Sequence, residues 1–355
     1  PRAEVFMSTK KSNLKNNKNK AKIKPEKDLN LKPSKEDGVF PIVGIGASAG
    51  GLEAYTTFLR DLPLDTGMGF VLVQHQDPTH HSALTELLNK ITKLPVQEVT
   101  NGMRVRPNQV YVMPPNTNMH MVDGILKLHP RTEARGLHLP IDFFFQSLAE
   151  YHKVRAVGVL LSGTASDGTL GLKAIKAAGG ITFAQDEKSA KYSGMPKHAV
   201  DPGVVDYVMP PNQIAVEIGK IAGHPILKNR RIIEIKEPSP EQPPHDEELF
   251  NIFRILKKYS GVNFENYKPN TILRRISRRM LLQRVETLSD YVEHLRNSPK
   301  EISALYEDIL INVTSFFRDP ETFDVLKEEI FPRLMSKSSP QRNLRIWVPA
   351  CSTGE

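Results

Sequence analysis

The chain has 355 residues, of which 39% are hydrophobic and 25% are charged, and its formal net charge is +8. This length is enough for about two domains, and no apolar run reaches the ~18–20 residues that a transmembrane helix needs. The first residues lack the apolar segment of a signal peptide, and the single cysteine, Cys351, cannot form an internal disulfide. We therefore expect a cytoplasmic protein that does not insert directly into a membrane.

The positive charge is concentrated at the start of the chain. Residues 1–40 contain eleven Lys and Arg against five Asp and Glu, a net charge of +6, so the remaining residues sum to only +2. Because this segment is rich in Lys and Asn and poor in apolar residues, residues 1–38 are expected to form a disordered basic tail. It has no aromatic residues interleaved with the basic ones, so we expect no nucleic-acid partner.

Residues 39–222 alternate short apolar runs with amphipathic stretches. The apolar runs predict buried strands at 39–45, 69–74, 110–113, 156–162 and 181–184. Apolar residues at helical spacing predict helices at 52–62, 83–91, 141–152 and 170–178. Asp123-Gly124, between alternating apolar residues, predicts a β-hairpin. Together these elements predict an α/β domain with a doubly wound, mainly parallel sheet that is covered on both faces.

The remaining residues predict a linker and a helical region. Residues 223–247 include the run EPSPEQPP and are expected to be a proline-rich linker. Residues 248–338 are expected to form a small all-α domain, with helices near 249–256, 270–283, 288–295, 302–310 and 320–335. Residues 339–355 contain one apolar strand, 344–348, followed by a turn of small residues. They are expected to be the start of a truncated α/β domain.

A serine lies on the glycine-rich turn after the first predicted strand. Gly46-Ala47-Ser48-Ala49-Gly50 fits G-x-S-x-G, the sharp turn that exposes a nucleophile at the carboxyl edge of a sheet. The N–H groups of the following helix could stabilise an oxyanion there. The same run also fits the dinucleotide fingerprint G-x-G-x-x-A, but the second strand ends in Gln74-His75 instead of an acidic residue. The turn favours a hydrolase and leaves a nucleotide site or a purely structural turn as alternatives.

Two further predicted strands are followed by residues that could act with the serine, a histidine as base and an aspartate that orients the histidine. His75 closes the second strand, and Asp167 follows the strand at 156–162. In a parallel sheet these ends open onto one edge, where catalytic groups gather. Ser48 is then the nucleophile, His75 the base and Asp167 the residue that orients the imidazole. The structural alternatives are a capping histidine and an aspartate that caps the next helix. The order Ser–His–Asp differs from that of the α/β-hydrolases, so their topology is not expected.

A metal site is a further interpretation of the same region. His75 lies close in sequence to three other residues with metal-binding side chains, Asp77, His80 and His81. Their spacing completes no known ligand pattern, and a serine nucleophile needs no metal. We expect no metal here.

Six segments of residues 40–222 resemble the catalytic domain of the CheB family of chemoreceptor glutamate methylesterases. In chain order they are GIGASAGG, VLVQHQDPTH, GMRVRPNQVYVMPPN, GVLLSGTASDGTLGL, AQDEKSAKYSGMPKHAV and DPGVVDYVMP. The family's triad falls on Ser48, His75 and Asp167. The resemblance implies hydrolysis of glutamyl methyl esters on receptor helices without a cofactor, and deamidation of glutamine as a further activity. Gly163-Thr164 stands where the family commonly has Gly-Met. A non-catalytic regulatory or nucleotide-binding module of a signalling protein is the alternative.

Residues 246–355 resemble the beginning of the CheR family of chemoreceptor glutamate methyltransferases. The matching features are the helical pattern, the segment NVTSFFRD at 312–319 and the segment RIWVPACSTGE at 345–355. The resemblance implies contacts to S-adenosylmethionine from Asn312, Thr314, Arg318 and Glu355. Because only the first strand of the cofactor-binding sheet is present, weak or no binding of S-adenosylmethionine is expected.

A basic stripe is predicted on the helix at 270–283. It consists of four arginines at positions i, i+1, i+4 and i+5, namely Arg274, Arg275, Arg278 and Arg279. Such a stripe is usually a solvated helix face. The resemblance to the methyltransferases implies that it contacts the acidic helices of methyl-accepting chemoreceptors.

Overall fold

The computed structural model describes residues 40–75, 84–131, 139–228, 247–265, 267–310, 320–336 and 347. The basic tail, most of the expected linker and nearly all of the segment 339–355 lie outside the described residues. Within these ranges, no helix combines the length and the apolar character needed to cross a bilayer.

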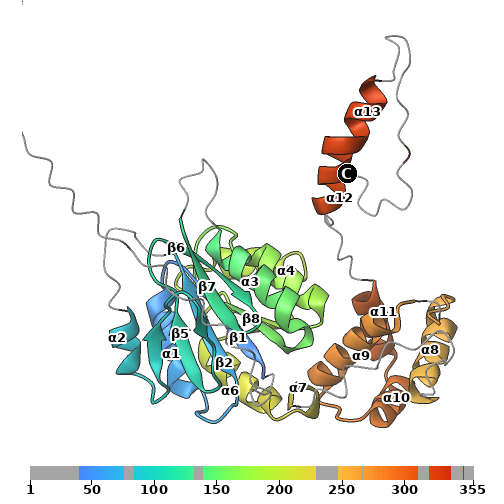
Figure 1. Cartoon of the computed structure of the whole chain (residues 1–355). Helices are drawn as coiled ribbons and strands as arrows, with labels where there is room; N and C mark the ends of the chain where they lie inside the picture. Colours follow the sequence, from blue (N-terminus) through green and yellow to red (C-terminus); the bar gives the residue numbers. More distant parts are fainter. Residues whose placement is uncertain are drawn as a thin grey trace, which may run out of the picture. The chain divides into compact units, whose positions relative to one another are not determined.

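A seven-stranded parallel sheet forms the centre of residues 40–228 (Figure 1). Its spatial order is β10-β9-β8-β1-β2-β5-β3. The bounds are β1 Ile42–Ala47, β2 Gly69–Gln74, β3 Val96–Glu98, β5 Gln109–Val112, β8 Ala156–Leu160, β9 Ile181–Gln185 and β10 Tyr207–Met209. β1, β8 and β9 are buried along their whole length, which explains why β1 and β8 have no polar side chain and why β9 has only Thr182 and Gln185. The predicted mainly parallel α/β sheet is confirmed.

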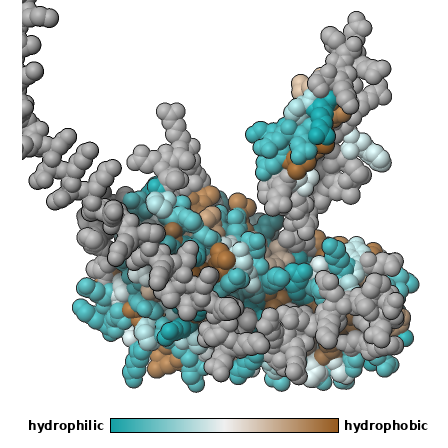
Figure 2. Space-filling view, viewed as in Figure 1, coloured by the Kyte–Doolittle hydropathy of each residue, from teal (hydrophilic) through white to brown (hydrophobic). Residues whose placement is uncertain are grey.

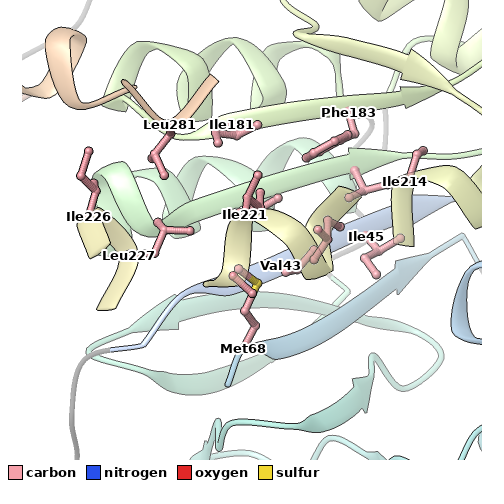
Figure 3. Close-up of a cluster of buried hydrophobic side chains, with 14 of the residues drawn as sticks. Val43, Ile45, Met68, Ile181, Phe183, Ile214, Ile221, Ile226, Leu227 and Leu281 are labelled. Carbon is pink, nitrogen blue, oxygen red and sulfur yellow. The ribbon is translucent and has the colours of Figure 1, made fainter. Parts of the chain in front are cut away.

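Helices cover both faces of this sheet. On one face, α1 (Gly51–Asp61) and α6 (Pro211–Ala222) pack against Val43 and Ile45 of β1, and Figure 3 shows these two residues near Ile214 and Ile221 of α6. On the other face, α3 (Pro140–His152) and α4 (Thr169–Ala178) pack against β1, β2 and β8. The shorter helices are α2 Leu84–Asn89, η1 Lys153–Arg155, α5 Gly194–Val200 and α7 Pro225–Lys228. On the face seen in Figure 2, the described surface is mostly hydrophilic with separate apolar patches.

A three-stranded sheet, in the order β4-β7-β6, adjoins α3. It consists of β4 (Met103–Arg104), β6 (Thr117–Val122) and β7 (Ile125–Pro130). β6 and β7 form the predicted hairpin, and both turn residues have positive φ, 48° for Asp123 and 73° for Gly124. An Asp-Gly pair suits such a turn because both positions require left-handed backbone. The hairpin is confirmed, whereas the two- and three-residue strands β3, β4 and β10 were not predicted.

Residues 247–310 form four helices, as predicted. They are α8 Glu247–Ser260, α9 Pro269–Gln283, α10 Leu288–Asn297 and α11 Pro299–Ile309. Thr287 caps α10 by accepting from Asp290 N at 3.1 Å, and Ser298 caps α11 by accepting from Glu301 N at 3.3 Å. The helix predicted near 320–335 is present as α12 (Pro320–Val325), a π-helical turn η3 (Leu326–Ile330) and α13 (Phe331–Ser336).

Arg278 of α9 is fully buried between carboxylates from two parts of the chain. Its guanidinium pairs with Asp206, which precedes β10, and with Asp308 of α11. Its Nε donates to Gly180 O at 3.1 Å, immediately before β9. A buried guanidinium is tolerated when its charge and its donors are matched in this way. Arg278 therefore joins the helical region to the parallel-sheet domain.

The expectation of a solvated basic stripe on α9 is wrong. Arg275 is also buried, and its Nη1 donates to Lys176 O at 2.8 Å. Arg279 is paired with Glu301, to whose Oε1 its Nε donates at 2.8 Å. The arginines of the predicted stripe are Arg274, Arg275, Arg278 and Arg279. Because the partners of three of them are internal, the stripe does not support the expected contact with chemoreceptor helices.

Apolar contacts accompany the buried arginines of α9. Leu281 belongs to the same hydrophobic cluster as Ile181 of β9 and Ile226 and Leu227 of α7 (Figure 3). All four side chains are less than 2% exposed. The helical region and the sheet domain thus share one continuous core at this point.

Replacing Arg278 by Ala should lower the free energy of unfolding by about 3–5 kcal/mol, because the buried carboxylates of Asp206 and Asp308 lose their shared partner. Urea denaturation followed by circular dichroism measures this loss. Arg284, which pairs with Glu217 but has 56% of its side chain exposed, is the matched control. Arg284→Ala should cost at most about 1 kcal/mol. Equal losses in the two variants would contradict this account of Arg278.

Candidate active site

Ser48 lies on the turn between β1 and α1. Its N–H donates to Ser162 O at 3.0 Å, and its carbonyl accepts from Gly51 N at 2.9 Å. Gly50 has a φ of 75°, and a Cβ atom there would lie 2.6 Å from Ser162 Oγ. Only glycine fits this position, both for its left-handed backbone and for the close approach. The turn therefore has the tight geometry that the G-x-S-x-G pattern predicts.

The side chain of Ser162 ties the turn to a second loop. Its Oγ donates to Ala49 O at 2.8 Å and accepts from Tyr192 N at 3.0 Å. Its backbone N–H donates to the buried Gln185 side chain at 2.8 Å. Ser162 follows β8, Gln185 ends β9, and Tyr192 lies in the loop before α5. The Ser48 turn is thus held by the segments that follow two neighbouring strands.

Gly163 packs directly against Ser48. A Cβ atom at Gly163 would lie 3.0 Å from Ser48 Cβ and 2.5 Å from Cε of the buried Met195. Its N–H donates to Tyr192 O at 2.9 Å, and its carbonyl accepts from Met195 N at 2.9 Å. The position next to the serine therefore has no room for a side chain.

Strand register brings the three predicted site residues to one edge of the sheet. β1 lies between β2 and β8, with Ala47 paired to Gln74 and Gly46 paired to Leu160. Ser48 and His75 are the residues that directly follow Ala47 and Gln74, the last paired residues of β1 and β2. His75 Nε2 lies 3.0 Å from Asp167 Oδ2, and their side chains are 30% and 1% exposed. The structure brings His75 and Asp167 into contact and places Ser48 at the end of the strand between β2 and β8.

Asp167 has a second set of partners at the beginning of α3. Its Oδ2 accepts from Ile141 N at 3.0 Å, and its Oδ1 accepts from Asp142 N at 2.9 Å. Asp167 therefore caps α3. The sequence interpretation of Asp167 as a cap of the next helix is wrong, because the N-cap position of α4 is Gly168, at a φ of 93°. Asp167 instead caps α3, a helix that precedes it in the chain.

Asp142 is a neighbour of Asp167 that the sequence did not reveal. Its side chain is buried in the first turn of α3, and its Oδ1 accepts from Gly171 N, in the first turn of α4, at 2.6 Å. The pKa of Asp142 is raised to about 6, because burial and, to a smaller extent, the charge of Asp167 raise it more than the N–H group of Gly171 lowers it. In the sequence Asp142 is an ordinary acidic residue after a helix-initiating proline, so no pattern distinguished it.

A pocket of about 210 Å³ adjoins the Ser48 turn. Its walls come from the first two turns of α1, the beginning of α6, the end of β9 and the segments that follow β8, β9 and β10. They are formed by Gly50, Glu53, Ala54, Thr57, Ser162, Gln185, Ser189, Lys191, Pro210, Pro211 and Asn212. It lies where the strand order reverses about β1, the usual place for ligands in such a sheet.

The other expected site residues lie outside the described residues. These are Asn312, Thr314, Arg318 and Glu355 of the expected cofactor site, and Asp77, His80 and His81 of the metal alternative. In the part of the chain that the structure describes, no three metal-ligating side chains gather into a site.

Three family models match consecutive parts of the chain. Residues 43–218 match the CheB methylesterase. Residues 247–310 match the all-alpha domain of the CheR methyltransferase, and residues 312–355 match its S-adenosylmethionine-binding domain. The first match covers β1 to α6, which include Ser48, His75 and Asp167.

Similar proteins include an uncharacterized 104.1 kDa protein of Rhodobacter capsulatus, 36% identical over 77% of this chain and 30% of its own length. A protein-glutamate methylesterase/protein-glutamine glutaminase of Burkholderia pseudomallei is 36% identical over 52% of this chain and 55% of its own. The chain therefore spans between 30% and 55% of these curated relatives. The crystal structure of the Thermotoga maritima CheB methylesterase catalytic domain matches with a TM-score of 0.48 and 29% identity, over 52% of this chain and 99% of that one.

The order of these matches follows the order of the folded regions. The parallel-sheet domain corresponds to the first match, and α8 to α11 correspond to the second. The chain therefore carries a CheB methylesterase domain at residues 43–218, followed by the all-α domain of the CheR methyltransferase family at residues 247–310 and part of its S-adenosylmethionine-binding domain at residues 312–355.

Proposed function

We propose that residues 43–218 hydrolyse glutamyl methyl esters on proteins, with Ser48 as nucleophile, His75 as base and Asp167 as the residue that orients His75. The observation that carries this proposal is the 3.0 Å separation between His75 Nε2 and Asp167 Oδ2, at the sheet edge where Ser48 follows the neighbouring strand β1. The name of the Burkholderia relative supports the substrate class and glutamine deamidation as a second reaction of the same site. The proposed substrates are methyl-accepting chemoreceptors.

The reaction follows from the roles of the three side chains. Asp167 lies against Nε2 of His75, so Nδ1 is the ring nitrogen left to accept the proton of Ser48. The Ser48 oxygen attacks the ester carbonyl, and the protonated imidazole then gives its proton to the departing methoxide, which leaves as methanol. Water, deprotonated by His75, attacks the acyl-serine, and His75 returns that proton to the Ser48 oxygen as the acyl–serine bond breaks. The glutamic acid that is released then loses its proton to the solvent and becomes the carboxylate. Asp167 stabilises the imidazolium in both steps.

The oxyanion needs N–H donors that are not already committed. The N–H groups of Ser48 and Gly163 donate to Ser162 O and Tyr192 O, and that of Gly51 donates to Ser48 O. Among the described residues around Ser48, the N–H groups of Ala49, Gly50 and Thr164 have no backbone acceptor. Thr164 follows Gly163, whose backbone packs on Ser48. We therefore propose that the oxyanion donors come from the N–H groups of Ala49, Gly50 and Thr164.

We propose S-adenosylmethionine as the cofactor of the full-length methyltransferase part to which the last residues of the chain belong. The match of residues 312–355 to the S-adenosylmethionine-binding domain supports this. The assignment of individual contacts to Asn312, Thr314, Arg318 and Glu355 rests on the sequence resemblance and stays a prediction.

Methanol release from a methylated chemoreceptor fragment tests the esterase directly. Ser48→Ala and His75→Ala should each lower kcat by about three orders of magnitude or more, because nucleophile and base act as a unit. The controls are Ser166→Ala, an exposed serine beside Asp167, and His198→Ala, an exposed histidine on α5. Both controls should stay close to wild type. Equal release from Ser48→Ala and wild type would refute the proposal.

Gly163→Ala tests the close approach to the serine. The added methyl group would meet Ser48 Cβ at 3.0 Å and Met195 Cε at 2.5 Å, so the serine should shift. We expect kcat for methanol release to fall by about one to two orders of magnitude. Gly194→Ala is the matched control, because its nearest neighbour would be 3.6 Å away. If both variants keep wild-type kcat, Gly163 does not position Ser48.

A further inference from the structure

Two buried aspartates, Asp142 and Asp167, each accept hydrogen bonds from backbone N–H groups at the start of a helix, Asp142 at α4 and Asp167 at α3. Asp167, just before α4, accepts from the N–H groups of Ile141 and Asp142 at the start of α3. Asp142, in the first turn of α3, accepts from Gly171 N in the first turn of α4. The exchange is reciprocal, since each carboxylate lies at the positive end of the other residue's helix.

This exchange fixes the segment that carries Asp167. The backbone N–H groups of Gly168 and Leu170 also interact with the Asp142 carboxyl, together with that of Gly171. Gly168 is the residue next to Asp167, so Asp142 holds the chain immediately after it. The N–H of Asp142 holds the Asp167 carboxylate itself at 2.9 Å. Asp142 therefore constrains both the backbone that follows Asp167 and the Asp167 side chain.

We propose that Asp142 is a positioning residue of the esterase site, whose carboxylate holds the start of α4 so that Asp167 reaches His75. The inference rests on the proposed function, because it assigns Asp142 a part in orienting the base. Asp142 acts only through Asp167, whose Oδ2 is shared between Ile141 N and His75 Nε2. A small rotation of the Asp167 carboxylate would lengthen the contact to His75.

A purely structural role for Asp142 makes a different prediction. If the carboxylate only stabilised α4, its loss would lower stability and leave the His75–Asp167 geometry unchanged in the folded molecules. Ser147 provides a comparison on the same helix, because its Oγ accepts from Met121 N at 3.0 Å and lies on a later turn of α3. Ser147→Ala removes an acceptor of a backbone N–H without touching the start of α4.

The kinetic test compares Asp142→Ala, Asp142→Asn and Ser147→Ala in the full chain, by methanol release at a temperature where each variant is folded by circular dichroism. Asp142→Ala should lower kcat by about 10–100-fold with KM within about twofold of wild type, as expected for a group that orients a catalytic residue. Asp142→Asn, whose amide oxygen can still accept from Gly171 N, should recover most of that loss. Ser147→Ala should keep wild-type kcat.

A second readout is independent of catalysis. The proton NMR resonance of His75 Nε2–H, assigned by its loss in His75→Ala, reports the contact with Asp167. It should shift in Asp142→Ala, return towards its wild-type position in Asp142→Asn and stay unchanged in Ser147→Ala. An unchanged resonance in Asp142→Ala, or equal kcat losses in Asp142→Ala and Ser147→Ala, would overturn the positioning role. If wild type released no methanol, the esterase proposal would fail, and the resonance would still decide the role of Asp142.

Discussion

The pairing of β1 with β2 on one side and β8 on the other is the constraint on which the site depends. Because all three strands are parallel and in close register, their carboxyl ends open at one edge, and whatever residue follows each strand is brought there. Ser48 and His75 follow paired positions, and the loop after β8 returns Asp167 to the same place. The burial of β1 and β8 on both faces makes this register hard to change, since a slip by one residue would move every side chain to the opposite face.

The backbone of α3 holds the Asp167 carboxylate in place beside His75. Its carboxylate accepts two backbone N–H groups from α3 and still lies 3.0 Å from His75. A fully buried carboxylate requires partners of this kind, because an ionised group without them would be strongly destabilising. The same bonds that make its burial tolerable also restrict the directions in which it can face His75. Stability and orientation of the acid therefore have one cause.

The long elements could be predicted from the sequence because their apolar period is a local property. The helices of the second region and the buried strands β1, β2, β8 and β9 are where the pattern placed them. Strands of two or three residues, such as β4 and β10, are too short to show a period. Arg278 and Asp142 depend on partners about 30 residues away or more, Asp206 and Asp308 for the first and Gly171 for the second. The spacing of residues along one helix carries no information about such partners. From the sequence alone, a buried arginine such as Arg278 therefore cannot be distinguished from a solvent-exposed one.

The position of the buried arginine bears on how substrate reaches the esterase. Arg278 contacts Gly180 and Asp206, which precede β9 and β10 and so lie at the amino ends of these strands. Ser48 and His75 follow β1 and β2, at the carboxyl ends. In a parallel sheet these are opposite edges, so α9 packs on the sheet domain away from the Ser48 edge. The apolar contacts of Leu281 lie in the same region, beside Ile181 at the start of β9. The contacts of α9 can therefore be extensive without covering the proposed catalytic residues.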